Sequence, residues 1–210
     1  YYLACTSPGF ATIDETPFIQ DMEHYTYCSI CNITPPLRSV HCKKCGKCVL
    51  RRDHHCPWLG ICVGLKNHFF FVLYLFFDSI TFFIFIRESY PVTKINDDSF
   101  IRWFFTSFLC AIICAIGVFG FLQTIFLLPF HIFLALMNKT TWESLKASKT
   151  PYLKEWYSSI GTYSRGILLN IKEFITMRWD IPLYQYPFGP RLEQWKEENS
   201  FLVNDKYECC

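Results

Sequence analysis

The chain has 210 residues, of which 51% are hydrophobic, and phenylalanine alone contributes 22. The apolar excess lies in two blocks after residue 67, which argues against one large soluble core and favours membrane spans. The net charge of +2 says little about partners, but seven basic residues and one acid lie between Arg38 and Lys66. A short basic loop beside a span indicates the cytoplasmic side of a membrane.

The N-terminal residues combine an apolar start with turn signals. Residues 1–4 are apolar, and Ser7-Pro8-Gly9 interrupts any regular element that follows them. The chain opens at Tyr1, with neither a Met nor the basic and apolar regions of a signal peptide. We interpret residues 1–23 as the end of a preceding transmembrane helix and a juxtamembrane segment, and we expect the chain to be a fragment.

Residues 24–67 form a candidate zinc domain. The 35 residues from Cys28 to Cys62 hold seven of the twelve cysteines and three of the six histidines. The C-x2-C pairs with interleaved histidines are typical of metal sites, and thiols in a cytoplasmic loop stay reduced, so a disulfide scaffold is disfavoured. Segments this short between ligands cannot bury a core, which implies that metal supplies the folding energy.

Ligand counting predicts two zinc sites. A closed zinc site takes four thiolate or imidazole ligands, so two sites use eight of the ten cysteines and histidines in the cluster. Steric crowding disfavours metal binding by His54, His55 and Cys56 together. The spacing supports two interleaved Cys3His sites, although a single zinc with spare thiols stays possible. The first site would use Cys28, Cys31, His41 and Cys48, and the second would use Cys42, Cys45, His55 and Cys62.

Asp53, His54 and Cys56 remain once the eight ligands are removed. A thiol becomes a good nucleophile when it is deprotonated, an imidazole can take its proton, and a carboxylate can orient that imidazole. The basic side chains of Arg51 and Arg52 would also favour the thiolate. The alternative is that Asp53 and His54 support the zinc ligands and that Cys56 is an inert thiol.

Two apolar runs come after the cluster. Residues 69–86 carry one charge, Asp78, and at about 1.5 Å per residue they nearly cross the roughly 30 Å hydrocarbon core of a bilayer. The alternative is a buried helix of a soluble protein. In the second run, Gly117 and Gly120 would allow close helix packing. We therefore predict a transmembrane helix over 68–88, a lumenal loop over 89–101, a transmembrane helix with a cytosolic extension over 102–137, and a cytosolic tail over 138–210.

A cysteine nucleophile so close to a span indicates a substrate that lies partly in the membrane. Phe69 comes thirteen positions after Cys56, which places the thiolate near the lipid headgroups. A thioester with an acyl chain in the bilayer and a polar carrier outside, such as acyl-CoA, fits this position. Attack by Cys56 would give an acyl-enzyme, and a second thiol would then accept the acyl group.

The cluster, with Asn67 and Phe71 behind it, resembles the DHHC cysteine-rich domain of protein S-acyltransferases, also called palmitoyltransferases. Thr140-Thr141-Trp142-Glu143 is similar to the TTxE motif of that family. Thr6-Ser7-Pro8-Gly9 resembles its DPG motif, with Ser7 where Asp is usual.

The C-terminal part resembles the same family. Residues 163–170 and Phe174 look like its C-terminal motif, with Gly161 where Asn is common. The resemblance therefore covers nearly the whole chain. The residues that it marks as structural motif positions are Asn67, Thr140, Thr141, Glu143 and Asn170.

The resemblance implies an all-α multi-pass membrane bundle of four spans, with a small zinc-stapled cytosolic cysteine-rich domain of short β-hairpins and loops. The first span and nearly all of the second would be absent from this chain. Cys56 would carry the S-palmitoyl intermediate, His54 would be the general base and Asp53 would orient His54. The implied cofactors are two structural zinc ions, with palmitoyl-CoA or another acyl-CoA as co-substrate.

The implied partners are membrane-associated proteins with juxtamembrane cysteines, and the lipid bilayer, with no nucleic acid among them. The implied location is the endomembrane system, Golgi or endoplasmic reticulum, with the active site facing the cytosol. Cys5, Cys209 and Cys210 are further candidates for acylation, because thiols beside membranes are common acylation sites.

Two other classes of protein compete with the acyltransferase. A membrane-tethered zinc module could bind a protein or RNA partner without catalysis, but such a module has no need of the additional Asp, His and Cys. A thiol–disulfide exchange protein could use the C-x2-C pairs as redox dithiols, and bound zinc would argue against it.

Overall fold

The computed structural model describes residues 2–13, 25–89, 99–146 and 163–176. These residues belong to two compact units. One unit comprises residues 1–71 and 133–210, and the other comprises residues 72–132. Gly161, Cys209 and Cys210, on which sequence predictions fell, lie outside the described residues.

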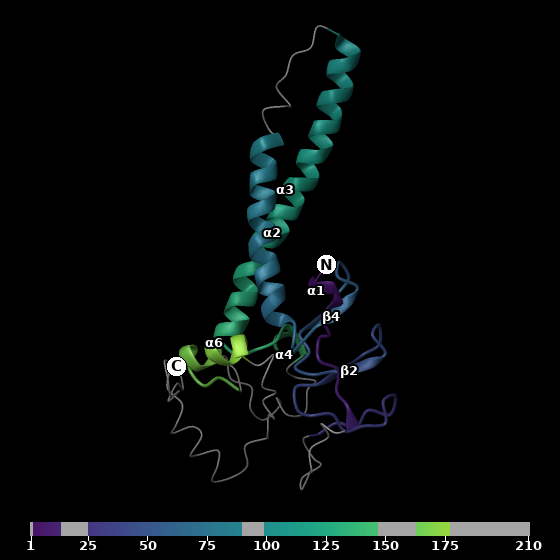
Figure 1. Cartoon of the computed structure of the whole chain (residues 1–210), viewed down its shortest axis with the longest axis vertical. Helices are drawn as coiled ribbons and strands as arrows, with labels where there is room; N and C mark the ends of the chain where they lie inside the picture. Colours follow the sequence, from purple (N-terminus) through teal and green to yellow (C-terminus); the bar gives the residue numbers. More distant parts are fainter. Residues whose placement is uncertain (1, 14–24, 90–98, 147–162, 177–210) are drawn as a thin grey trace. The chain divides into compact units, whose positions relative to one another are not determined.

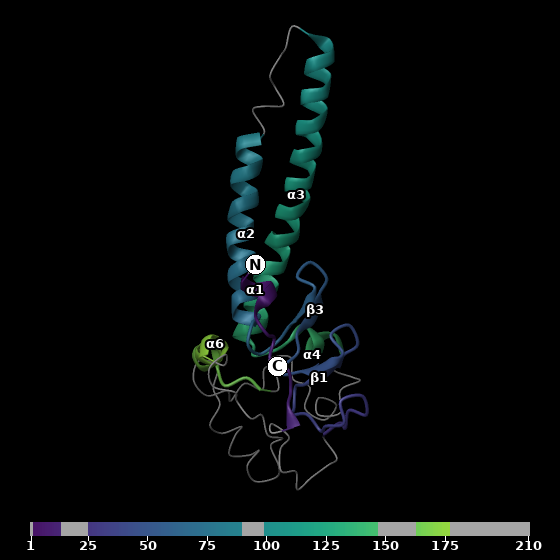
Figure 2. The ribbon, with the colours of Figure 1, turned by 45° about the vertical axis from the view of Figure 1, so that its right-hand side comes forward.

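The first unit is built on two antiparallel hairpins of three-residue strands (Figure 2). Strand β1 (Val40–Cys42) pairs with β2 (Lys47–Val49), and β3 (His54–Cys56) pairs with β4 (Ile61–Val63). The small core that they form consists of Cys42, Val49 and Cys62, with Phe10 and Cys45 packed against it. The predicted domain of short β-hairpins is therefore confirmed, and its core is too small to replace metal as a source of stability.

The N-terminal segment runs beside β2 after the short helix α1 (Tyr2–Cys5). Phe10 forms a bridge with Val49, and the Leu50 N–H donates to the Gly9 carbonyl at 2.8 Å. Gly9 has φ 87°, a left-handed conformation that favours glycine, and its N–H donates to the Ser7 hydroxyl at 3.2 Å. Ser7 thus closes the turn with its side-chain oxygen, as an Asp would at this position.

A tight turn leads from β4 into the first apolar helix. A Cβ on Gly64 would lie 2.7 Å from Val49 Cγ1 and 2.8 Å from the Pro8 carbonyl oxygen, so only glycine fits there. The buried Asn67 side chain spans the turn, because it accepts from the Gly64 N–H at 2.8 Å and donates to the Cys62 carbonyl at 3.0 Å. The Asn67 carbonyl then accepts the Phe71 N–H and begins the helix.

Helices α2 (His68–Ser89) and α3 (Phe100–Leu136) are both long and apolar enough to cross a membrane. Within residues 72–132 they run side by side (Figure 1). A Cβ on Gly117 would lie 2.8 Å from the ring of Phe85, and one on Gly120 would overlap the ring of Phe82. The two glycines therefore receive two phenylalanine rings in antiparallel register, as expected of small residues between spans.

Helix α3 ends in a Schellman motif. The Lys139 N–H donates to the Leu134 carbonyl and the Asn138 N–H donates to the Ala135 carbonyl, with Asn138 at φ 48°. The chain then enters the short helix α4 (Thr141–Lys146). Beyond residue 162 the described chain forms α6 (Ile167–Thr176), anchored by Asn170, which donates to the Leu136 carbonyl at 2.7 Å.

Candidate active site and metal centres

The first predicted metal cluster is assembled from a turn and a hairpin. The sulfur atoms of Cys28, Cys31 and Cys48 lie 3.5, 3.4 and 3.9 Å from Nδ1 of His41. Cys48 sits directly across the β1–β2 ladder from His41. Tetrahedral zinc with bonds of about 2.3 Å to sulfur and about 2.0 Å to nitrogen would place these atoms about 3.5 Å apart. The donor set therefore fits zinc.

The second cluster repeats this geometry on the other hairpin. The sulfur atoms of Cys42, Cys45 and Cys62 lie 3.7, 3.4 and 3.7 Å from Nδ1 of His55, and the Cys45 and Cys62 sulfurs are 3.6 Å apart. Cys62 faces His55 across the β3–β4 ladder. The eight donor atoms thus gather into the two groups of four that the spacing predicted, each with all its atoms within 4.8 Å of one another.

Strand β3 places the histidine of the second cluster on one face, and the two side chains outside the clusters on the other. Successive side chains of a strand point to opposite faces, so His54 and Cys56 share one face while His55 points to the other. His55 joins the second cluster, and neither His54 nor Cys56 belongs to either cluster. The alternation gives a physical reason for the crowding that the sequence suggested, because three consecutive side chains cannot all reach one metal.

Cys56 and His54 form a hydrogen-bonded pair. Burial would raise the pKa of the Cys56 thiol, but hydrogen bonds from His54 and from the Leu59 and Trp58 N–H groups, with the charge of His54, lower the pKa below its ordinary value. Burial would likewise lower the pKa of His54, but hydrogen bonds to Asp53 and Cys56 and their charges raise it to about 9. The geometry favours a thiolate beside an imidazolium.

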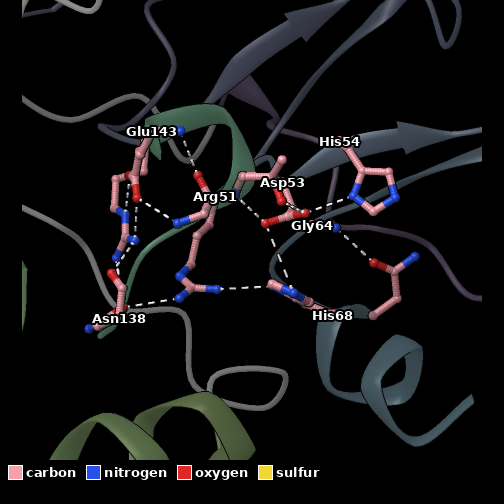
Figure 3. Close-up of polar contacts among 11 residues, drawn as sticks. Arg51, Asp53, His54, Gly64, His68, Asn138 and Glu143 are labelled. Carbon is pink, nitrogen blue, oxygen red and sulfur yellow. Dashed lines mark hydrogen bonds and ion pairs between the residues drawn. The ribbon is translucent and has the colours of Figure 1, made fainter. Parts of the chain in front are cut away.

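Asp53 is held from several directions, as Figure 3 shows. Its Oδ2 lies 2.7 Å from His54 Nδ1 and accepts from the Thr141 hydroxyl at 2.8 Å, while its Oδ1 accepts from the Thr141 N–H at 2.7 Å. The Asp53 side chain is fully buried, whereas about a quarter of the His54 side chain is exposed. The carboxylate therefore fixes which nitrogen of His54 faces Cys56.

The segment that resembles TTxE is a helix capping box. The Thr140 hydroxyl accepts from the Glu143 N–H at 3.1 Å, and the Glu143 carboxylate accepts from the Thr140 N–H at 2.9 Å. The same carboxylate accepts two hydrogen bonds from the buried Arg38 guanidinium, at 2.7 and 2.9 Å. The capping box starts α4 at Thr141 and so places the Thr141 N–H and hydroxyl against Asp53.

The sequence suggested that the charges of Arg51 and Arg52 favour the Cys56 thiolate, but both guanidiniums contact other groups. The buried Arg51 guanidinium donates to Asn138 Oδ1 at 3.0 Å and lies 3.4 Å from His68 Nδ1. The Arg52 guanidinium stacks over the Trp142 ring at 4.9 Å. Both cations are engaged elsewhere, and the groups that favour the Cys56 thiolate are His54 and the backbone N–H groups of Trp58 and Leu59.

Sequence reasoning missed four buried polar residues around Asp53. Each is separated from most of its partners by long stretches of chain, and none belongs to a periodic or ligand pattern. The sequence signal that could have identified them is a basic or amide residue next to a motif. This signal is weak. The four residues are Arg38, Arg51, His68 and Asn138, all of them buried.

Comparison with known proteins gives the family. The sequence model of the DHHC palmitoyltransferase family matches residues 21–148. A protein of Dictyostelium discoideum that carries the name ZDHHC-type palmitoyltransferase 7 is 35% identical over 202 residues, covering 91% of this chain and 45% of the relative. Human palmitoyltransferase ZDHHC13 is 30% identical over 200 residues, covering 83% of this chain and 32% of the relative.

Palmitoyltransferase ERF2 of Kluyveromyces lactis is 36% identical over 127 residues, covering 60% of this chain and 34% of the relative. The chain thus spans less than half the length of the curated relatives that it matches here. The match of the family model covers more than half of the chain, and the chain belongs to the DHHC palmitoyltransferase family.

Proposed function

We propose that this protein is a protein S-palmitoyltransferase that moves a long-chain acyl group from acyl-CoA to cysteines of membrane-associated proteins. One observation carries the proposal. His54 and Cys56 lie on the face of β3 opposite His55, and Asp53, the residue before the strand, completes a hydrogen-bonded chain with them. A zinc module that only binds a partner has no need of a thiol activated in this way.

In the first step the Cys56 sulfur attacks the thioester carbonyl of acyl-CoA. The carbon–sulfur bond to CoA breaks, and the CoA thiolate takes a proton from the His54 imidazolium. In the second step neutral His54 takes the proton of a substrate thiol, and the resulting thiolate attacks the acyl-Cys56 thioester. Cys56 leaves as a thiolate, so each step moves one acyl group and one proton. Asp53 holds the His54 ring in place throughout.

Two structural zinc ions would hold the frame around this chain. The supporting observation is the fit of each Cys3His group to the distances that tetrahedral zinc requires. Zinc supplies folding free energy and contributes no reaction step. We assign Cys28, Cys31, His41 and Cys48 to the first ion, and Cys42, Cys45, His55 and Cys62 to the second.

Charge and hydrophobicity support a membrane arrangement. Helices α2 and α3 would each cross the bilayer, within a four-span bundle, and the basic residues of the zinc domain would keep it on the cytosolic side. The residues between the two helices would be lumenal. The proposed location is the Golgi or endoplasmic reticulum, where the acyl chain of acyl-CoA lies in the bilayer and protein substrates present juxtamembrane cysteines.

The deciding experiment incubates the purified membrane protein with labelled palmitoyl-CoA. We expect label on the wild type that is released by hydroxylamine, and no label on Cys56→Ser with zinc content unchanged. Cys110→Ser is the matched control and should keep the label, because Cys110 lies on α3 outside both clusters. Wild type that takes no label, or Cys56→Ser that keeps it, would reject the proposal and favour the zinc-binding interaction module.

A further inference from the structure

Three residues behind Asp53 share an unusual backbone conformation. Among the described residues, four that are not glycine have positive φ, and three of them are Arg38 at 67°, Arg51 at 40° and Asn138 at 48°. All three are buried and meet at one atom, since Arg38 and Arg51 both donate to Asn138 Oδ1 at 3.0 Å. Left-handed residues with side chains persist where their surroundings over-determine them, and such conformations gather at functional sites.

Arg51 connects this cluster to the active site through an imidazole. Arg51 Nη1 lies 3.4 Å from Nδ1 of His68, the first residue of α2. A guanidinium has donors and no acceptor, so Nδ1 must accept and the proton of neutral His68 must sit on Nε2. Figure 3 shows the Arg51 side chain between Asn138 and His68. The arginine therefore selects one tautomer of the histidine.

The protonated nitrogen faces the catalytic carboxylate. Nε2 of His68 lies 3.9 Å from Asp53 Oδ1, and both side chains are fully buried. This distance is too long for a direct hydrogen bond, so the interaction is between the N–H dipole and the charge of the carboxylate. A buried site screens that interaction far less than water does.

Packing keeps the imidazole in this position. The Phe174 ring of α6 meets the His68 ring edge-on, with centroids 5.1 Å apart, and Phe174 is itself buried. Thr141 occupies both oxygens of Asp53 from another direction, and His54 takes Oδ2. His68 Nε2 faces the other carboxylate oxygen, Oδ1.

We propose that His68, held by Arg51 with its proton on Nε2, is a positioning residue that keeps Asp53 oriented toward His54. The inference rests on the proposed acyltransferase function and names a residue that acts through Asp53 without touching the substrate. It assigns a functional purpose to the left-handed conformation of Arg51, which directs the guanidinium to both Asn138 and His68.

The test compares three substitutions of His68 in the membrane protein. His68→Gln retains an acceptor and a donor at nearly the spacing of the two ring nitrogens. His68→Asn is one bond shorter and reaches the Nδ1 position only, and His68→Phe keeps the ring and removes both nitrogens. The readouts are the rate of acyl-Cys56 formation at saturating palmitoyl-CoA, the palmitoyl-CoA concentration that gives half of this rate, and the zinc content.

We expect His68→Phe and His68→Asn to slow acyl-enzyme formation by about ten- to a hundredfold, with unchanged zinc and unchanged half-saturating palmitoyl-CoA. His68→Gln should recover most of the rate. In an Asp53→Asn background, His68→Phe should have little further effect, because the two residues act as one unit. A residue that only stabilises the fold would lower zinc content and would add its effect to that of Asp53→Asn.

Equal rates for His68→Gln and His68→Asn at equal zinc content would overturn the inference, as would a wild-type rate for His68→Phe. If His68→Phe loses zinc, the comparison of Gln with Asn decides alone. Wild type and Cys56→Ser run alongside. Label that depends on Cys56 but is insensitive to His68 rejects this inference only, whereas the absence of label on the wild type rejects the proposed function itself.

Discussion

The β1–β2 and β3–β4 hairpins have the same arrangement of strands, turn and ligand residues, but the cysteines that end their first strands have different partners. In each, a histidine in the middle of one strand faces a cysteine in the middle of the other, and the last residue of the first strand is also a cysteine. The turn between the strands has the same length in both, and Gly46 and Gly60 occupy the same place in it, each with φ 67°. The two hairpins can therefore be compared position by position.

They differ at the third position after the strand-ending cysteine. In the first hairpin Cys42 has Cys45 at that position, and the pair enters one metal cluster. In the second hairpin Cys56 has Leu59 there, and Cys56 belongs to no cluster. Backbone N–H groups two and three residues on still point at both sulfurs, from Lys44 and Cys45 in one hairpin and from Trp58 and Leu59 in the other.

The difference suggests a structural origin for the proposed nucleophile. Cys56 begins a turn like that of a zinc-binding C-x2-C pair, but the second cysteine of the pair is missing. The backbone N–H groups of this turn therefore favour a thiolate that belongs to neither metal cluster. His54 supplies the positive partner that zinc supplies to Cys42. At the corresponding position β1 carries Val40, which cannot do so.

The largest expected effect separates the scaffold histidine from the proposed base. His41→Ala should lose zinc and unfold the cysteine-rich domain, because structural zinc contributes folding free energy on the order of 10 kcal/mol. His54→Ala should retain about two zinc ions per chain and lose acyl-enzyme formation. Metal analysis and palmitoyl-CoA labelling of both variants make the measurement, and equal loss of zinc would contradict the assignment.

The missing second cysteine can be restored. Leu59→Cys should make Cys56 a metal ligand or let it form a disulfide with the new thiol. Acyl-enzyme formation should then fall at least about tenfold, because the free thiolate is the proposed nucleophile. Leu59→Ala is the matched control and should keep most of the activity. If Leu59→Cys binds no additional zinc, forms no disulfide and acylates like the wild type, the equivalence of the two turns is wrong.

A smaller effect is expected from the hydroxyl that α4 directs at Asp53. Thr141→Val removes the Oγ1 hydrogen bond to Asp53 and keeps the backbone one. A hydrogen bond to a charged group contributes about 1.5–3 kcal/mol, which corresponds to a roughly ten- to hundredfold lower rate of acyl-enzyme formation. Thr141→Ser should behave like the wild type, and a Val variant as active as Ser would separate the motif from catalysis.

The smallest expected effect is on the reactivity of the Cys56 thiolate in the absence of a substrate. The pKa of Cys56 is lowered and that of His54 is raised to about 9, so the thiolate–imidazolium pair exists between these two values. We expect iodoacetamide to alkylate Cys56 at about pH 7 faster than it alkylates an ordinary thiol of pKa about 8.5. The advantage should disappear as pH falls below the lowered pKa of Cys56. His54→Gln should shift the profile upward, and an unshifted profile would assign the thiolate to the backbone N–H groups alone.

Much of the site could be predicted from local spacing. Zinc chemistry restricts ligands to a few residue types in short motifs, so counting them separated two groups of four from the remaining Asp53, His54 and Cys56. The apolar runs predicted helices over 68–88 and 102–137, and the observed α2 and α3 differ from these by one or two residues at their ends.

Only the tertiary structure decided which groups surround Asp53. Arg38 meets Glu143 across 105 residues of chain, and Arg51 meets Asn138 across 87. No periodicity links such positions. The side chain of Arg51 contacts distant residues although Arg51 lies close to Asp53 in the sequence, and its φ of 40° could not be predicted from its neighbours. Metal ligands can be predicted from short-range spacing, because one metal binds residues that lie close together in the sequence. The orientation of a buried carboxylate depends on which distant elements the fold brings together.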